Sequence, residues 1–399
     1  MAHRLKLAVI GDPHLALPRG DPDRRLEVDP GRKLHGLSAE LLQATIDEVN
    51  ASPGIDAVLL LGDLTRDSEL FNHEAALMLL KKINAPLYII LGNHDMLRQR
   101  PQGVSYPDEP HLDRHEVADM YRHCGLPGGK TRYVVELPGD VALVVLDSNR
   151  SLEELDAAGE DISRQDHGWV GGKQLGWLDE VLGRIRAGGR LSLVAVHHSV
   201  TDHSPAEQPG HLLHPLCEQW QLHDSSAARQ CLARHRVPLV LSGHLHAQSF
   251  NVQDNVANLV TSATVSYPHA WRLLSITTDA IYIESRPLGS IPSVDGLQQS
   301  SRAWMAEGMG AMIEKHAASN RKLAGFAKEL GEMITCSGWW PRFCDGTLAG
   351  FSMDEACIPK NSAGGMVFSQ AQRVLDEFGE WKAARPDPNE LEIPLKPYL

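Results

Sequence analysis

Short apolar runs alternate with amphipathic stretches over the first hundred residues of this chain. Apolar runs at 5–10, 57–61 and 86–91 predict strands, and helical periodicity at 36–50 and near 68–83 predicts helices between them. This βαβαβ alternation is typical of a parallel sheet with both faces covered, where ligands bind beyond the carboxyl ends of the strands. The pattern therefore predicts an α/β fold with its site at that edge.

Further apolar runs predict that the sheet structure continues along the chain. They lie at 132–137, 141–147, 191–196 and 238–242. After these, short apolar runs follow one another to about residue 285 without helical segments, which predicts an antiparallel meander. Two long connections, 96–131 and 149–171, interrupt the pattern. Connections of this length in a compact domain are usually functional or mobile.

The character of the sequence changes after Pro287. A turn-rich stretch, GSIPSVDG, precedes a helical segment at 300–334, and the remainder is expected to be irregular. Because residues 290–399 carry no chemical motif, we expect them to serve packing or oligomerisation. The predicted organisation is a main domain at 1–289 and a partly helical extension at 290–399.

Composition indicates an ordinary folded protein and limits the kinds of partner that we expect. The formal net charge is −13, which disfavours nucleic acid as a partner. The apolar run 5–10 is too short for a signal peptide, and no run reaches the roughly 18 residues of a membrane span. The six cysteines are scattered without a CxxC pair, so neither a disulfide framework nor a zinc site from Cys336, Cys344 and Cys357 is expected. The expected location is cytoplasmic.

Five polar clusters occur in order, each directly after an apolar run. They are Gly11-Asp12-Pro13-His14, Gly62-Asp63, Gly92-Asn93-His94-Asp95, His197-His198 and Gly243-His244-Leu245-His246. Taken singly, each also fits a turn, a helix cap or a hydrogen-bonded strand end. Their carboxylate, amide and imidazole donors suit Mn, Fe, Zn or Co. Because a carboxylate has two oxygens, Asp63 can bridge two cations, and the clusters together predict a dinuclear metal site.

In these clusters the sequence resembles the calcineurin-like metallophosphoesterases. Their blocks are Asp-x-His, Gly-Asp, Gly-Asn-His-Asp/Glu, His and Gly-His-x-His, and the resemblance covers roughly residues 5–286. It implies a four-layer α/β/β/α sandwich, to which the C-terminal extension is added. The segments GDLTRD, LGNHD, LDSN, GKQLGWLDEVL, VHHS and SGHLH are most similar to the cyclic-nucleotide phosphodiesterase branch.

The resemblance also implies a role for each site residue. The first metal ion would be held by Asp12, His14, Asp63 and His246, and the second by Asp63, Asn93, His197 and His244. His94 corresponds to the histidine that contacts the substrate. Asp67 is expected to orient His94, although many relatives carry the acidic residue one position earlier, where this chain has Arg66.

The implied activity is hydrolysis of a small phosphodiester, such as a 3′,5′-cyclic nucleotide, with two metal ions. Mn and Fe are the first choices, and Zn, Co and Mg are alternatives. Hydrolysis of monoesters or pyrophosphate-type bonds in nucleotides or lipids is a second hypothesis, and a metal-binding regulatory scaffold is a non-enzymatic one. The expected partner is a small phosphate ester, and the extension is a candidate surface for a homo-oligomer.

One segment departs from the family pattern. His198-Ser199 stands where relatives often have His-Pro-Pro, and a histidine-rich stretch follows with His203, His211, His214 and His223. These side chains could tune specificity or make local hydrogen bonds. The neighbouring Gly168, Gln174 and Trp177 are expected to be scaffold residues.

Overall fold

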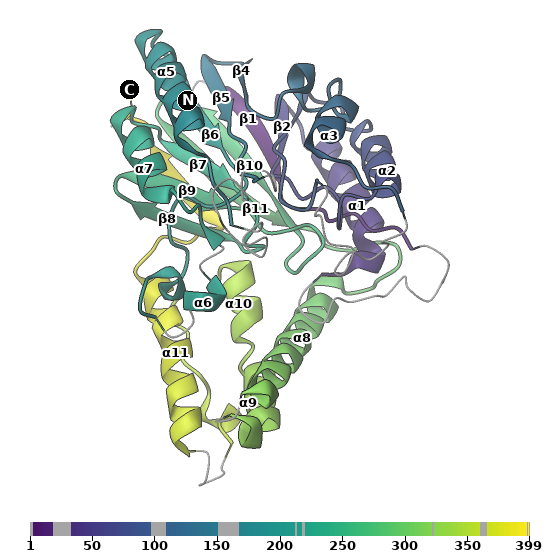
Figure 1. Cartoon of the computed structure of the whole chain (residues 1–399), viewed down its shortest axis with the longest axis vertical. Coiled ribbons are helices and arrows are strands. Elements are labelled where there is room, and N and C mark those ends of the chain that lie inside the picture. The colour runs from purple at the N-terminus through teal and green to yellow at the C-terminus, as the bar shows by residue number, and fades with distance from the viewer. Residues whose placement is uncertain are drawn as a thin grey trace.

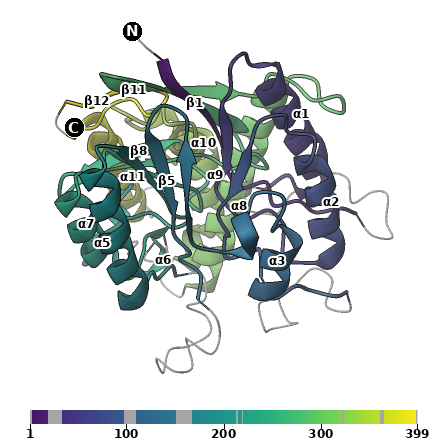
Figure 2. The ribbon, with the colours of Figure 1, turned by 90° about the horizontal axis from the view of Figure 1, so that it is seen from above.

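The computed structural model of this chain shows two six-stranded sheets packed face to face, with helices on their outer faces (Figure 1, Figure 2). It describes residues 3–18, 33–96, 109–150, 167–211, 214–217, 220–320, 323–359, 365–396 and 398. This is the predicted α/β fold with α/β/β/α layers. Parts of the two long connections, 97–108 and 151–166, lie outside the described residues.

The first sheet has the order β12-β11-β10-β1-β2-β3. Its strands are β1 His3–Ile10, β2 Ala57–Leu60, β3 Leu87–Ile89, β10 Ala270–Thr277, β11 Ala280–Pro287 and β12 Glu390–Pro394. β1, β2 and β3 pair in parallel, whereas β10, β11 and β12 join β1 in antiparallel register. The helices that follow its strands are α1 Ser38–Ala51, α2 Leu70–Leu80 and α3 Arg114–Met120.

The second sheet has the order β4-β5-β6-β7-β9-β8. Its strands are β4 Tyr133–Leu137, β5 Val141–Val145, β6 Leu191–Ala195, β7 Leu239–Ser242, β8 Ser249–Gln253 and β9 Val256–Val260. β5, β6, β7 and β9 are parallel, with β4 and β8 antiparallel at the two edges. Helices α5 Gly172–Ala187 and α7 Ser225–Arg234 cover it.

The side chains of β5 alternate between two apolar cores, one on each face of the second sheet. Val141, Leu143 and Val145 belong to the apolar core that includes residues of the first sheet. Ala142 and Val144 point the other way and pack with residues of α5 and α7. Successive side chains of a strand lie on opposite faces, so an uninterrupted apolar run is needed here.

The prediction of one meander after residue 242 is wrong. β8 and β9 form a hairpin in the second sheet, and β10 and β11 form a hairpin in the first. The chain therefore crosses between the sheets after Val260. Local apolar patterning specifies each strand, but it does not specify which sheet a hairpin joins, because that depends on distant partners.

The C-terminal region is more ordered than the sequence predicted. It contains α8 Leu297–Ser319, α9 Ala327–Ser337, α10 Trp339–Asp345 and α11 Gly365–Ala383, which together we call the C-terminal lobe. The lobe lies below the sandwich in Figure 1, beside the short α6 His214–Cys217. Trp339, Trp340 and Phe343 of α10 pack with Phe378 of α11, and burial of these rings orders a segment expected to be irregular.

Short 3-10 helices complete the described structure. They are η2 His35–Leu37, η3 Pro127–Gly129, η5 Pro205–Glu207, η7 Ala324–Phe326 and η8 Glu355–Cys357. Within the described ranges, no helix is both long enough and apolar enough to cross a bilayer.

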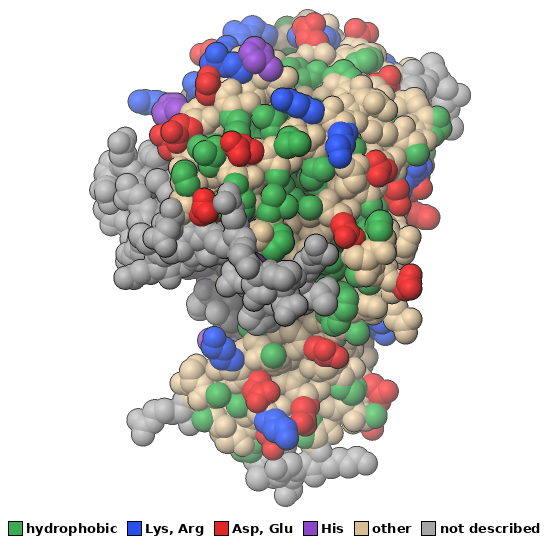
Figure 3. All heavy atoms as spheres, turned by 90° about the vertical axis from the view of Figure 1, so that its right-hand side faces the viewer, with side chains coloured by type: hydrophobic (Ala, Val, Ile, Leu, Met, Phe, Trp, Pro, Cys, Tyr) green, Lys and Arg blue, Asp and Glu red, His purple; other side chains and the backbone are tan. Residues whose placement is uncertain are grey.

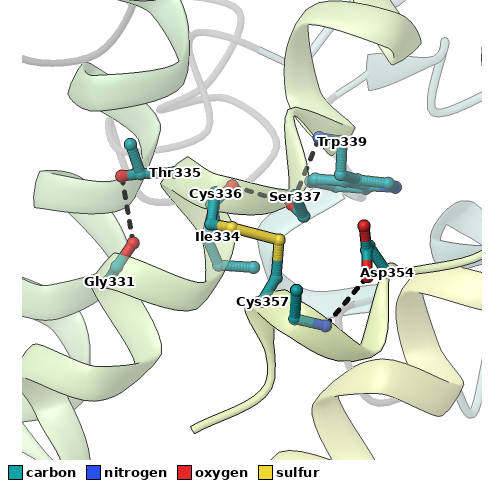
Figure 4. The surroundings of a disulfide bond; sticks show 9 residues. Gly331, Ile334, Thr335, Cys336, Ser337, Trp339, Asp354 and Cys357 are labelled. Atoms are coloured by element: carbon teal, nitrogen blue, oxygen red, sulfur yellow. Dashed lines mark hydrogen bonds between the residues drawn. A yellow bond between two sulfur atoms is a disulfide. The ribbon is translucent and has the colours of Figure 1, made fainter.

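A disulfide bond links Cys336 at the end of α9 to Cys357 of η8 (Figure 4). The cysteine spacing did not predict it. The two residues are 21 positions apart in the sequence. A cross-link over a loop of this size typically stabilises the folded state by about 3 kcal/mol. It joins α9 to the otherwise loop-like segment before α11.

Apolar surface is found on the sandwich itself. Helix α2 carries apolar residues around most of its circumference, and Met78 is 71% exposed. Figure 3 shows apolar side chains gathered in the middle of the face formed by the right-hand side of Figure 1, where α2 lies, with charged side chains around them. Apolar side chains therefore reach the surface on the sandwich as well as on the C-terminal extension.

We predict that His269 makes the fold sensitive to acid. Burial lowers the pKa of His269 from 6.5 to about 4, and its Nδ1 lies 2.8 Å from the carbonyl oxygen of Thr264. The unfolded chain binds a proton below pH 6.5 and the folded chain does not, so stability is present above that pH and falls as the pH drops towards 4. Denaturant unfolding of His269→Gln should show a pH slope smaller by up to about 1.4 kcal/mol per pH unit.

The exposed His316 offers the matched control, since His316→Gln on α8 should keep the wild-type slope. Identical slopes for wild type and His269→Gln would contradict the assignment.

Candidate metal centre

The predicted ligands converge at the carboxyl ends of strands from both sheets. Asp12 and His14 follow β1, Asp63 follows β2 and Asn93 follows β3, all in the first sheet. The second sheet supplies His197 after β6 and the pair His244 and His246 after β7. The site therefore spans the seam between the sheets, and the structure brings all seven side chains together.

Two groups of donor atoms meet at Asp63. In the first group, His14 Nε2 lies 3.3 Å from Asp63 Oδ2 and 3.0 Å from His246 Nε2, which lies 3.2 Å from Asp12 Oδ2. In the second, His197 Nε2 lies 3.5 Å from Asp63 Oδ2 and 3.1 Å from Asn93 Oδ1, and His244 Nδ1 lies 3.1 Å from the same Asn93 atom. Asp63 is common to both groups.

The donor geometry fits metal ions. Ligand bonds of about 2.0–2.2 Å place neighbouring donors roughly 3.0–3.5 Å apart, which is the spacing found here. The four donors of Asp12, His14, Asp63 and His246 all lie within 4.8 Å of one another. Asp12 Oδ1 is buried and has no hydrogen-bond partner among the described residues. A buried carboxylate oxygen without a partner is costly unless a cation is bound beside it.

Several ligands have unusual backbone conformations. His14, Asp63, His244 and His246 have φ angles of 40°, 48°, 63° and 54°. Residues with a Cβ rarely adopt this left-handed region, although Asp and His are among those that tolerate it best. Such strain clusters at functional sites, because the surrounding fold must hold it in place.

Two glycines leave room for the carboxylates. A Cβ at Gly92 would lie 2.2 Å from Asp63 Oδ1, and a Cβ at Gly243 would lie 2.3 Å from Asp12 Oδ1. Both distances are far shorter than any non-bonded contact. The glycines that precede Asn93 and His244 are therefore needed for the close approach of neighbouring strand ends.

The electrostatics favour a bound cation. Burial, opposed by His197 and assisted by the negative charge of Asp63, raises the pKa of Asp12 to about 7. The pKa of Asp63 stays well below its usual value despite burial, because His197, His94 and His14 surround it. Burial, together with the charge of Lys33, holds the pKa of His14 well below its usual value. The site thus combines an anion at Asp63 with a neutral imidazole at His14.

His94 lies beside the ligands and is partly open to solvent. Its side chain is 20% exposed, and its ring centroid is 4.7 Å from that of His14. Its Nδ1 lies 2.5 Å from the carbonyl oxygen of Arg66 and 3.5 Å from Asp67 Oδ1. Asp67 is therefore within reach of His94, but a backbone carbonyl is the nearer acceptor. No sequence signal could have identified that acceptor.

Asp95 is a supporting residue to which sequence reasoning gave no role. Its Oδ1 accepts hydrogen bonds from the backbone N–H of Leu64 at 2.6 Å and Thr65 at 3.3 Å, and its Oδ2 accepts one from Gly92 at 2.8 Å. It therefore ties the loop after β2 to the loop after β3. Its position in the Gly-Asn-His-Asp cluster was the available signal.

His198 is a second such residue. It is fully buried, and its Nδ1 lies 2.8 Å from Ser148 Oγ. Its ring centroid is 4.3 Å from that of His244, and its donor atom groups with those of His197 and His244 within 4.8 Å. His198 thus packs against the ring of His244, or adds a donor to that group.

The histidine-rich stretch divides into buried and partly buried residues. His203 is fully buried, with Nδ1 2.8 Å from Ser249 Oγ and Nε2 3.1 Å from Thr201 Oγ1, so it makes local hydrogen bonds. His211 lies 3.5 Å from Glu377 of α11.

Among the expected scaffold residues, Gln174 binds the backbone N–H and the carbonyl of Asp147, which follows β5.

Comparison with known proteins places the chain in a family. The model of the calcineurin-like phosphoesterases matches residues 5–248, a range that includes all seven predicted ligands and His94. The chain belongs to the calcineurin-like phosphoesterase family. No curated protein sequence matches it.

The solved structures that are similar to this chain are distant from it in sequence. A dimetal phosphatase from Danio rerio is 15% identical, with a TM-score of 0.53, over 72% of this chain and 97% of that one. A protein described as a 5′-nucleotidase from Staphylococcus aureus is 14% identical, with a TM-score of 0.45, over 76% of this chain and 58% of that one. At this level of identity the likeness to the first shows a shared fold.

We predict that Gly243→Ala abolishes tight metal binding without unfolding the sandwich. The added methyl group would displace Asp12 Oδ1 from the first donor group, and a displaced ligand should weaken binding by at least the roughly 10–100-fold seen for weaker supporting contacts. Metal content after dialysis, with circular dichroism, measures this.

Gly176→Ala on α5 is the control, since nothing lies within 4 Å of the added Cβ. It should keep full metal content and gain about 0.5–1 kcal/mol of stability. Unchanged metal content in Gly243→Ala would exclude Asp12 as a ligand.

Proposed function

We propose that this chain is a dinuclear-metal hydrolase of small phosphodiesters. The observation that carries the proposal is the meeting of two donor groups at Asp63, with His94 beside them and partly exposed. The first ion would be held by Asp12, His14, Asp63 and His246, and the second by Asp63, Asn93, His197 and His244. Mixed oxygen and nitrogen donors favour Mn or Fe, with Zn, Co and Mg as alternatives.

Two bound ions would neutralise the phosphate charge and lower the pKa of an attacking water. The protein holds the donors at fixed spacing from both sheets, so little rearrangement accompanies the reaction. The side chain of Asp63 is held in position by the backbone, because its Oδ1 accepts a hydrogen bond from the N–H of His94 at 2.8 Å. This bond also fixes the position of His94 relative to the shared carboxylate.

His94 is the group that we assign to the leaving alkoxide. Its Nδ1 faces two acceptors, the Arg66 carbonyl and the Asp67 carboxylate, which together hold the ring in one orientation. Nε2 is then the nitrogen that would contact a phosphoryl oxygen and donate the proton. Asp67 acts through His94 and is a positioning residue.

The preference for diesters rests on the motifs shared with the cyclic-nucleotide phosphodiesterase branch. Hydrolysis of monoesters or pyrophosphate-type bonds would use the same ligands and the same histidine. A panel of 3′,5′-cyclic nucleotides, a bis-aryl phosphate and aryl monoesters, tested with protein loaded with Mn, Fe or Zn, separates these activities. Turnover of monoesters alone would exclude the diesterase assignment.

We expect substitutions of His94 and Asp63 to have different effects on catalysis and on metal binding. His94→Ala should retain both ions and lose about 10²–10⁴-fold in kcat, the range typical of general acid catalysis. Asp63→Ala should lose metal as well as turnover, because the removed carboxylate is shared by both donor groups. Metal analysis and steady-state kinetics on the same preparations test this. Near-normal turnover of several diesters by His94→Ala would rule out its role.

A further inference from the structure

The turn that carries two ligand histidines is packed against the C-terminal lobe. Leu245, which stands between His244 and His246, is 3% exposed. With Ala247 it belongs to the same apolar cluster as Trp340 and Phe343 of α10. The side chain between the two ligands is therefore part of the core of the lobe, although the family match ends at residue 248.

Backbone contacts extend this attachment. The N–H of Gln248 donates to the carbonyl of Cys344 at 2.7 Å. Gly346, which ends α10 with a φ of +81°, lies so close that an added Cβ would be 3.1 Å from the Gln248 carbonyl oxygen. One residue further on, Lys382 Nζ of α11 bonds Ser249 Oγ. The exit of the ligand turn is thus held by α10 and α11.

The residues that lead into the lobe pack on a segment that reaches the first donor group. Leu34, Leu37 and Leu41 form an apolar cluster with Leu288, Ile291, Val294 and Leu297, the last of which begins α8. Leu34 follows Lys33, whose Nζ lies 3.4 Å from His14 Nδ1. His14 and His246, whose Nε2 atoms are 3.0 Å apart, are therefore each flanked by a segment that packs on residues after 287.

The conformation of the turn explains why it needs support. His244 and His246 have φ angles of 63° and 54°, in the region that residues with a Cβ rarely adopt. Such a backbone persists only where its surroundings determine it. The described contacts from the lobe side are the burial of Leu245 and Ala247 and the hydrogen bond to Gln248.

We propose that the C-terminal lobe is a positioning element of the metal centre. Its contacts hold the Gly243–Gln248 turn in the conformation that aims His244 and His246 at the bound ions. This proposal rests on the ligand assignment made above. Because positioning and binding are linked, bound metal should in turn stabilise the lobe.

A pair of glycines in the lobe gives a matched test. Gly346 and Gly350 both have left-handed φ angles, +81° and +69°, so alanine strains the backbone at either position. An added Cβ at Gly346 meets Gln248 and Pro388, whereas nothing lies within 4 Å of one at Gly350. Gly346→Ala should weaken binding of Mn²⁺ by about tenfold or more, in the range found for residues that support ligands, and Gly350→Ala should leave it unchanged.

The measurements use the full-length chain. Titration calorimetry of the metal-free protein with Mn²⁺ gives the affinities, and the visible absorption spectrum of the Co²⁺-loaded protein reports the coordination. Leu245→Ala should reproduce the weaker binding and an altered Co²⁺ spectrum, and Leu245→Met should restore both. Thermal unfolding verifies that each variant is folded.

Two outcomes would overturn the proposal. One is equal loss of stability in both glycine variants with no change in Mn²⁺ affinity or Co²⁺ spectrum. The other is unchanged binding in Leu245→Ala. A wild-type protein that binds two ions but hydrolyses no phosphate ester would contradict the proposed function and leave the positioning result intact, so the two failures can be told apart.

Discussion

A single buried carboxylate, Asp63, imposes the main constraint on this structure. Its Oδ2 is the point where both donor groups meet, while its Oδ1 accepts the N–H of His94. A charge in this position is stable only among imidazoles and cations, and it is reachable only because Gly92 has no side chain. The two sheets must then end at the same level, since Asp63 comes from one and His197 from the other.

That alignment depends on the packing of the sheets. The shared core contains residues from β1, β2, β6 and β7, the strands that deliver most of the ligands. A slip of one residue along any of them would reverse its two faces and remove its ligand from the seam. The continuous apolar runs are therefore a requirement of the site as well as of the fold.

The sequence was sufficient to predict the strands of the sandwich and the meeting of their polar ends, because apolar runs and the donors that follow them are local features. It could not predict partners that are backbone atoms, such as the Arg66 carbonyl beside His94. It also failed where distant pairing decides the structure. The crossing of the hairpins between sheets, the Cys336–Cys357 bond and the order of α10 and α11 all depend on contacts between segments that carry no recognisable motif.

The return of the chain to the first sheet gives the C-terminal region a second significance. β12 pairs with β11 from Ala280 to Glu284, after the whole lobe has been traversed. The lobe is consequently a long insertion between two neighbouring strands, and both of its ends connect to the first sheet. A chain cut at the natural-looking boundary near 290 would leave β11 as an open sheet edge, and unpaired edges are templates for association between chains. A chain shortened at that boundary would thus lose an intramolecular strand partner and become prone to aggregation.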